Sequence, residues 1–282
     1  MPNKNRWENA VQWIRKNPGS IHLVRECYYD DPLINAAERY WKSYEWQSIR
    51  TLLQGKSGNA LDVGAGRGIS SYALARDGFN VTALEPNTSK LVGSAAIRQL
   101  AKESNLKIVV EERFSEKLPF PDQSFDLVFA RAVLHHTVDL RAACSEFLRV
   151  LKPSGRFIAV REHVISQPED LEVFLEDHPL HYLYGGENAF LLGDYETSIR
   201  EAGFKIDQVI GPLESAINFA PHTLQSLQQE IAVKATRNIP LARDLVRIAL
   251  GIPGVWSIAK HILKSVDHRP GRLYSFVAIR PN

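Results

Sequence analysis

Apolar residues between positions 59 and 162 fall into two alternating patterns, short continuous runs and longer segments with helical spacing. The short runs predict buried strands at 59–64, 80–85, 106–112, 125–130 and 156–162. The longer segments predict helices at 69–78, 88–104 and 139–151. Because strands and helices alternate, the pattern predicts an α/β fold with a mostly parallel sheet that carries helices on both faces.

The regions that flank this central part are also patterned. Residues 1–56 predict a helical extension, in which one helix runs from about Leu33 to Gly55. After residue 162 we expect a loop insertion at 163–193, a helix at 195–202, a strand at 204–210, helices at 222–235 and 240–264, and a last strand within 273–281. The predicted domains are therefore an N-terminal extension (1–56), a central domain (57–210 with 272–282) and a helical insertion (211–271).

The turn after the first predicted strand carries the clearest functional signal. It reads LDVGAGRG from Leu61 to Gly68, and Glu85 ends the next strand about twenty residues on. A strand, a glycine turn and a helix N-terminus place backbone N–H groups at the carboxyl end of a parallel sheet, where ligands of such folds bind. An acid at the offset of Glu85 commonly accepts hydrogen bonds from ribose hydroxyls.

The details of this turn favour a cationic cofactor. The third glycine comes one place earlier than in a dinucleotide fingerprint, because Ile69 occupies the fingerprint position. Asp62 lies inside the strand, and its carboxylate would repel a pyrophosphate and attract a cation. S-adenosylmethionine carries a sulfonium and an amino group and has no phosphate. These residues therefore favour S-adenosylmethionine over NAD.

Over roughly Ala60–Arg161 the chain resembles the class I S-adenosylmethionine-dependent methyltransferases, particularly the small-molecule group that includes the ubiquinone/menaquinone type. Five motifs in order carry the resemblance: LDVGAGRG, LEPN, LPFPDQSFDLVFA, LHH and FLRVLKPSGRF. The resemblance implies a Rossmann-like, mostly parallel seven-stranded sheet with an antiparallel last strand. It also implies S-adenosylmethionine as cofactor and S-adenosylhomocysteine as product.

The resemblance extends to individual cofactor contacts. The residues implied are Asp62, Gly64, Ala65, Gly66, Gly68, Glu85, Pro86, Ser115, Glu116 and Arg131. The chain departs from the family at Phe114, where an Asp is common, so Ser115 or Glu116 would contact the adenine instead. For Arg131 the alternatives are the cofactor carboxylate, an acidic substrate, or a salt bridge to Asp62 or Glu85. Family members often cover the cofactor with N-terminal helices, which makes Tyr28, Tyr29 and Tyr40 candidates, although aromatic residues at helical spacing are more often core.

Candidate catalytic residues follow the fourth and fifth strands. Methyl transfer to a hydroxyl usually needs a general base, and His136 and His163 stand at strand ends that face the ligand side. The neighbouring carboxylate of Glu162 is expected to raise the pKa of His163 toward the working range of a base. Adjacent residues on a strand point in opposite directions, however, so Glu162 and His163 cannot both enter the pocket if the strand continues.

The segment EDHPLHYLYGGEN, residues 176–188, is the densest polar cluster outside these motifs. Its candidate side chains are His181 as a further base and His178, Tyr182, Tyr184 and Glu187 as substrate ligands. The alternative is a hydrogen-bonded surface loop. No compact ligand spacing is present, so no metal site is expected. The segment resembles stretches in methyltransferases of bacterial surface-polysaccharide pathways, which makes a sugar hydroxyl a candidate acceptor.

The helical segment 240–264 is basic and amphipathic, as in helices that bind membrane surfaces. Pro253 and Gly254 break it into two short pieces, which favours a substrate lid or an oligomer contact over a membrane contact. The net charge of +2 gives no general attraction to nucleic acid. Cys27 and Cys144 form no metal or redox spacing, and no signal-peptide core or run of about eighteen apolar residues is present, so we expect a cytoplasmic protein.

The leading hypothesis from the sequence is an O-methyltransferase that acts on a small molecule or a glycan hydroxyl. A C-methyltransferase that acts on a quinone-like lipid is the first alternative, and the basic helical segment fits it. A non-catalytic module that binds S-adenosylmethionine is the second alternative. The intact turn and Glu85 argue for cofactor binding in all three cases.

Overall fold

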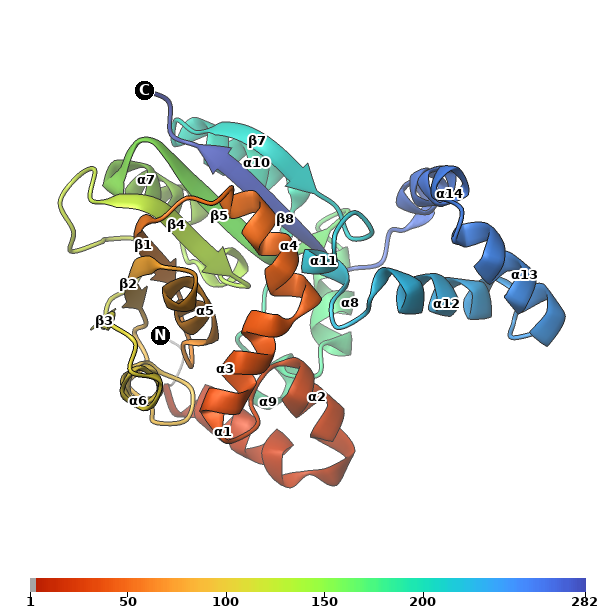
Figure 1. The fold of residues 1–282 in the computed structure, drawn as a ribbon, viewed down its shortest axis with the longest axis horizontal. Coiled ribbons are helices and arrows are strands. Elements are labelled where there is room, and N and C mark those ends of the chain that lie inside the picture. Colours follow the sequence, from red (N-terminus) through yellow and green to blue (C-terminus); the bar gives the residue numbers. More distant parts are fainter. Residues whose placement is uncertain (1–3) are drawn as a thin grey trace.

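The computed structural model describes residues 4–282, which are built around one central sheet (Figure 1). The strand order is β3-β2-β1-β4-β5-β8-β7, and β6 pairs with the end of β5. The strands are β1 (Gly58–Val63), β2 (Phe79–Leu84), β3 (Ile108–Glu111), β4 (Phe125–Arg131), β5 (Leu151–Ile165), β6 (Phe190–Leu191), β7 (Lys205–Ile210) and β8 (Arg272–Ile279). Only β8, among the described strands, runs antiparallel to its neighbours β5 and β7. The predicted α/β class and antiparallel last strand are confirmed, with the short β6 as an eighth strand.

Helices cover both faces of the sheet, as predicted. On one face α7 (Leu140–Val150) and α10 (Leu192–Glu201) enclose a core that includes Phe147, Phe157 and Phe276. On the other face α5 (Ile69–Arg76) and the N-terminal helices enclose a second core. Helix α6 (Ser94–Ser104) packs against β3. The parallel strands β1, β4 and β5 therefore end at the same edge of the sheet, between two packed layers.

The N-terminal extension is helical, but its second helix is shorter than predicted. The helices are α1 (Lys4–Lys16), the 3-10 turn η1 (Pro18–Ser20), α2 (Ile21–Glu26), α3 (Leu33–Lys42) and α4 (Tyr44–Leu53). The predicted continuous helix from Leu33 to Gly55 is wrong, because Ser43 is extended and caps α4. Its Oγ accepts a hydrogen bond from the backbone N–H of Trp46 at 3.1 Å. Serine at this position stabilises a helix start by satisfying one of its free N–H groups.

A buried ion pair joins α4 to the end of β4. The Nε of Arg131 donates to Glu45 Oε1 at 2.6 Å, and Nη2 donates to Oε2 at 3.1 Å. The guanidinium also lies 5.3 Å from the ring centre of Tyr40. The expected alternative of a salt bridge from Arg131 to Asp62 or Glu85 is therefore wrong, because the guanidinium pairs with the carboxylate of Glu45 instead.

The chain between β7 and β8 forms an arm that projects from the sheet (Figure 1). The chain first forms α11 (Ala216–Phe219), which packs against α4, and the arm then consists of α12 (Leu224–Ala235), α13 (Pro240–Leu250) and α14 (Pro253–Val266). They have a core of their own around Leu227, Leu250 and Trp256. The predicted break before Pro253 is present, and the axes of α13 and α14 differ by 104°. Among the described residues no single helix has the length and apolar content of a membrane span, although α13 and α14 reach them as a bent pair.

We expect Glu45→Ala to destabilise the protein by about 3–5 kcal/mol, because it leaves the buried guanidinium of Arg131 without its partner. Urea denaturation followed by circular dichroism measures this change. Lys42→Ala, which removes an exposed ion pair with Glu38, is the matched control and should cost less than about 1 kcal/mol. Equal losses for the two variants would contradict the structural role of Glu45.

Candidate active site

The glycine turn after β1 leaves open space for a ligand. Gly64, Gly66 and Gly68 have φ angles of +60°, +55° and +87°, a region that side chains other than glycine rarely adopt. A Cβ on Gly64 would lie 2.7 Å from a methyl group of Val133, so a side chain there would collide with the segment after β4. A Cβ on Gly66 would meet nothing within 4 Å. A ligand can therefore approach the backbone at Gly66.

Two buried acids lie beside this turn. Asp62 Oδ2 accepts a hydrogen bond from Ser71 Oγ at 2.5 Å, whereas its Oδ1 is buried without a partner. The carboxylate of Glu85 accepts from the backbone N–H groups of Gly66 at 2.7 Å and Asn87 at 2.8 Å. Burial raises the pKa of Asp62 and of Glu85 to about 7 in each case. A cation or a hydroxyl donor at this place would satisfy carboxylate lone pairs that now have no partner.

Other predicted cofactor residues are Ala65 and Pro86 at the ends of β1 and β2, and Ser115 and Glu116 in the segment after β3. Ala65 donates its N–H to Leu84 O at 3.1 Å, which holds the turn against the end of β2, where Pro86 follows Glu85. Ser115 is buried and its Oγ lies 3.3 Å from Glu116 Oε2. Glu116 Oε1 accepts from Val138 N at 3.0 Å. Phe114, by contrast, is 63% exposed, so Ser115 and Glu116 remain the candidates for contact with the adenine.

The three N-terminal tyrosines are packing residues in this structure. Tyr40 is fully buried against Trp46, with ring centres 5.5 Å apart. Tyr28 lies against Tyr40 at 5.2 Å, and Tyr29 against Trp7 at 5.7 Å. These contacts fit the expectation that aromatic residues at helical spacing form core.

A histidine cluster occupies the ends of β4 and β5, and its anchor is a residue pair that the sequence did not indicate. His135, in the 3-10 turn η2 (Leu134–His136), is buried, and its Nδ1 lies 2.7 Å from Glu162 Oε2. Glu162 also accepts the backbone N–H groups of Val133 at 3.1 Å and His135 at 3.2 Å. Burial lowers the pKa of His135 well below its ordinary value, so this imidazole is neutral.

His163, the residue after Glu162 in β5, also packs against the His135 ring. Its ring centre lies 4.7 Å from that of His135, and its Nδ1 lies 3.1 Å from the carbonyl oxygen of Gly271. The expected rise in its pKa is wrong, because the carboxylate of Glu162 binds His135 instead. Burial, followed by the neighbouring His135, lowers the pKa of His163 to about 3.

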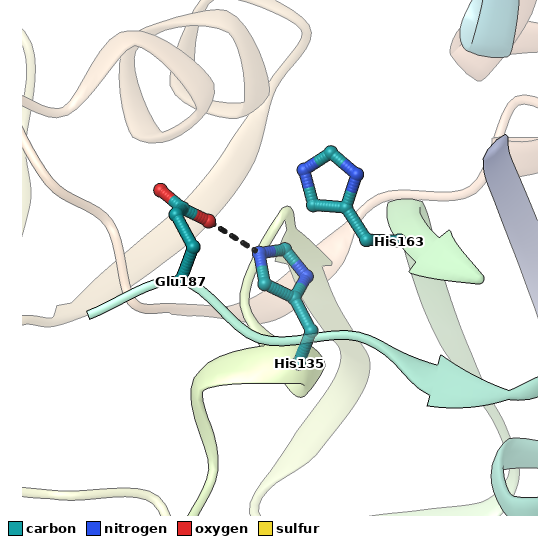
Figure 2. Close-up of side chains that lie close together, drawn as sticks. All are labelled: His135, His163 and Glu187. Atoms are coloured by element: carbon teal, nitrogen blue, oxygen red, sulfur yellow. Dashed lines mark ion pairs between the residues drawn. The ribbon is translucent and has the colours of Figure 1, made fainter. Parts of the chain in front are cut away.

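Glu187 brings the predicted substrate loop into the cluster. This loop runs from α8 (Asp170–Asp177) through α9 (His181–Tyr184) to β6. One oxygen of Glu187 accepts the Tyr184 hydroxyl, and the other lies 3.8 Å from His135 Nε2 and 3.9 Å from His136 Nε2. Burial acts to raise the pKa of Glu187, but His136 and then His178 outweigh it and lower this pKa. Figure 2 shows Glu187, His135 and His163 converging from three separate segments.

The other residues of the loop differ in their positions. His178 Nδ1 lies 3.9 Å from Glu187 Oε1, and its ring centre is 5.5 Å from that of His163, so it belongs to the cluster. His181 is half-buried, and its Nδ1 is buried without a partner. Tyr182 is 89% exposed and projects away from the buried groups. The loop thus adds a carboxylate and an imidazole to the strand ends.

Comparisons with known proteins place the central strands in a family. Residues 61–159 match the family described as a methyltransferase domain. Over 98 residues the chain is 39% identical to demethylmenaquinone methyltransferase of Clavibacter sepedonicus, covering 35% of this chain and 38% of the relative. Over 146 residues it is 30% identical to 27-O-demethylrifamycin SV methyltransferase of Amycolatopsis mediterranei, covering 51% and 53%.

A solved structure agrees in fold with a larger part of the chain. Phosphoethanolamine N-methyltransferase 2 of Haemonchus contortus superposes with a TM-score of 0.56 at 22% identity, over 93% of this chain and 60% of that one. The chain spans about half the length, or less, of the two curated relatives. The family match includes the glycine turn and His135 but ends before Glu162, so the loop with Glu187 lies outside it.

Proposed function

Because residues 61–159 form a class I S-adenosylmethionine-dependent methyltransferase domain, we propose that the chain is an enzyme that methylates a hydroxyl group of a small molecule or glycan. The observation that carries the proposal is the histidine cluster at the ends of β4 and β5, beside the glycine turn. A hydroxyl acceptor must lose a proton during methyl transfer, and a neutral imidazole is a group that can accept this proton.

The residues of the glycine turn fit the proposed cofactor. The unpartnered Oδ1 of Asp62 and the free lone pairs of Glu85 suit an amino cation and ribose hydroxyls, respectively. The open space over Gly66 suits close approach of the ligand to the backbone. When bound, S-adenosylmethionine supplies an electrophilic methyl group, which joins the acceptor oxygen as the carbon–sulfur bond breaks and its electron pair goes to sulfur.

Among the three candidate bases, we favour His136 as the proton acceptor. Its Nδ1 lies 3.0 Å from the carbonyl oxygen of Gly186, which can only accept, so this nitrogen carries the proton and Nε2 keeps a lone pair. Nε2 lies 3.9 Å from Glu187, whose negative charge would stabilise the imidazolium formed. The side chain of His136 is 37% exposed, which leaves it accessible to an acceptor. His163, with its pKa of about 3, is the weaker base.

The cofactor role of Glu85 can be tested by calorimetric titration with S-adenosylmethionine and S-adenosylhomocysteine. Glu85→Gln should weaken binding of both by about 1–3 kcal/mol, the scale of a hydrogen bond to a buried charge. Because the pKa of Glu85 is about 7 and hydroxyl donors prefer the carboxylate, wild-type affinity should rise as pH increases through this value. Glu103→Gln on the exposed surface is the control. Unchanged affinity in Glu85→Gln would refute the role.

His136→Ala should lower kcat by about 10²–10⁴-fold, the usual contribution of a general base, while calorimetry gives an unchanged affinity for S-adenosylmethionine. Added imidazole should restore part of the rate. His22→Ala removes an exposed histidine from α2 and should leave kcat unchanged. A fully active His136→Ala enzyme would transfer the role of base to another group, with His181 the next candidate.

A quinone-like lipid is a second candidate acceptor, favoured by the arm. Helices α13 and α14 expose an apolar face formed by Leu241, Leu245, Ile248, Ile252, Val255, Ile258, Ile262 and Val266. Four basic residues, Arg243, Arg247, Lys260 and Lys264, lie on the same two helices. Exposed apolar side chains beside basic ones are typical of helices that bind anionic membrane surfaces. A relative named demethylmenaquinone methyltransferase fits this candidate.

Vesicle sedimentation distinguishes the two acceptors. If the acceptor is a membrane lipid, the protein should sediment with vesicles that contain phosphatidylglycerol, and the double variant Leu245→Glu/Ile258→Glu should reduce the bound fraction at least tenfold. Val138→Glu, at a highly exposed apolar position outside the arm, should have no effect. Absence of wild-type sedimentation would remove the support for a lipid acceptor.

A further inference from the structure

The geometry points to a metal site: we propose that His135, His163 and Glu187 bind one divalent transition-metal ion of the Zn²⁺ type. One ring nitrogen of each histidine and one carboxylate oxygen of Glu187 all lie within 4.8 Å of one another. Ligands of a tetrahedral zinc ion stand about 3.4 Å apart, given metal–ligand distances of about 2.1 Å. His135 Nε2 and Glu187 Oε2 are already at 3.8 Å (Figure 2), so only a small movement completes the site.

The Nδ1 atoms of His135 and His163 have hydrogen-bond partners that orient both rings for metal binding. His135 Nδ1 faces the carboxylate of Glu162 at 2.7 Å, and His163 Nδ1 faces the carbonyl oxygen of Gly271 at 3.1 Å. Both partners accept hydrogen bonds, so each Nδ1 carries the proton and each Nε2 presents a lone pair. Metal-bound histidines nearly always have such a carboxylate or carbonyl partner, which fixes the tautomer and the ring orientation.

The buried negative charge of Glu187 also favours a cation in the cluster. Glu187 has a side chain only 6% exposed, and no Lys or Arg pairs with it among the residues that the structure describes. The basic groups nearest to it are three imidazoles, His135, His136 and His178, at 3.8–3.9 Å, and that of His135 is neutral. A carboxylate in this position is stabilised by a cation at the centre of the cluster.

The donor set selects the kind of metal. Two imidazole nitrogens and one carboxylate oxygen suit Zn²⁺ and its first-row neighbours, whereas Mg²⁺ prefers oxygen ligands alone. Three protein ligands leave a fourth position for water or an acceptor oxygen, as in catalytic rather than structural zinc sites. Coordination there would lower the pKa of an acceptor hydroxyl and ease transfer of its proton to His136. This catalytic role rests on the proposed function, whereas metal binding does not.

The test is metal binding by the full chain, with no activity assay involved. The purified protein is stripped with a chelator, dialysed against Zn²⁺ with or without excess Mg²⁺, and analysed for bound zinc by mass spectrometry. We expect one zinc ion per chain, unaffected by Mg²⁺. The same protein loaded with Co²⁺ should show the intense visible absorption of a four-coordinate cobalt ion.

Four variants assign the site. His163→Ala and Glu187→Gln should weaken zinc binding at least 100-fold. Glu162→Gln, which alters the hydrogen-bond partner of the His135 ring and removes no proposed ligand, should weaken it by about 10–100-fold. His222→Ala, which removes a surface histidine paired with Glu230 at 3.2 Å, should bind zinc like the wild type. Circular dichroism confirms that each variant is folded. If His163→Ala fails to fold, the isosteric Glu187→Gln decides.

Two results would overturn the proposal. One is a wild-type protein that retains well under one zinc ion per chain at micromolar zinc. The other is equal zinc binding by the wild type and Glu187→Gln, which would place the ion elsewhere. Because neither result involves S-adenosylmethionine or an acceptor, failure of the metal site and failure of the proposed methyl transfer are separate outcomes.

Discussion

The carboxylate of Glu162 is the group on which the candidate site depends. It is fully buried, and it accepts hydrogen bonds from the backbone of Val133 and from both the backbone and the ring of His135. These bonds tie the end of β5 to the segment after β4. Val133 in turn fills the space beside Gly64, so the same carboxylate sets the distance between the glycine turn and the histidines. A buried carboxylate is tolerated here because three donors replace its water.

The parts of the fold and the site that depend on local sequence were predictable. Apolar periodicity located the strands and helices of residues 59–162. Strands of a sheet that is covered by helices on both faces must be apolar, and the covering helices must be apolar on one side. The glycine turn was predictable because Gly64, Gly66 and Gly68 adopt positive φ angles that other residues rarely adopt. Glu85 was predictable because one helix, a short connection and one strand separate it from the turn.

The parts that depend on contacts between distant segments were not predictable. The adjacency of Glu162 and His163 suggested that these two side chains interact. In the structure the pairing of β5 with β8 is irregular between Ala159 and Glu162. Glu162 binds the ring of His135, 27 residues earlier in the chain, instead of the ring of His163. The partner of Arg131 is 86 positions away in α4. Nothing in the local pattern distinguishes Glu45 from other acids on amphipathic helices, so the ion pair appears only once the helices are packed.

The two halves of the site differ in their relation to the family match, because one lies inside the matched residues and the other lies beyond them. The glycine turn, Glu85 and His135 lie within the residues that match the methyltransferase domain family, whereas His163 and Glu187 lie beyond them. A fold shared by many methyltransferases supplies a cofactor site, while the acceptor is selected by the side chains added around it. In this chain the added side chains are imidazoles and a carboxylate held against the ends of β4 and β5. Residues 163–193, where the loop with Glu187 meets the histidines of the strand ends, are therefore the part of the site that the family match does not cover.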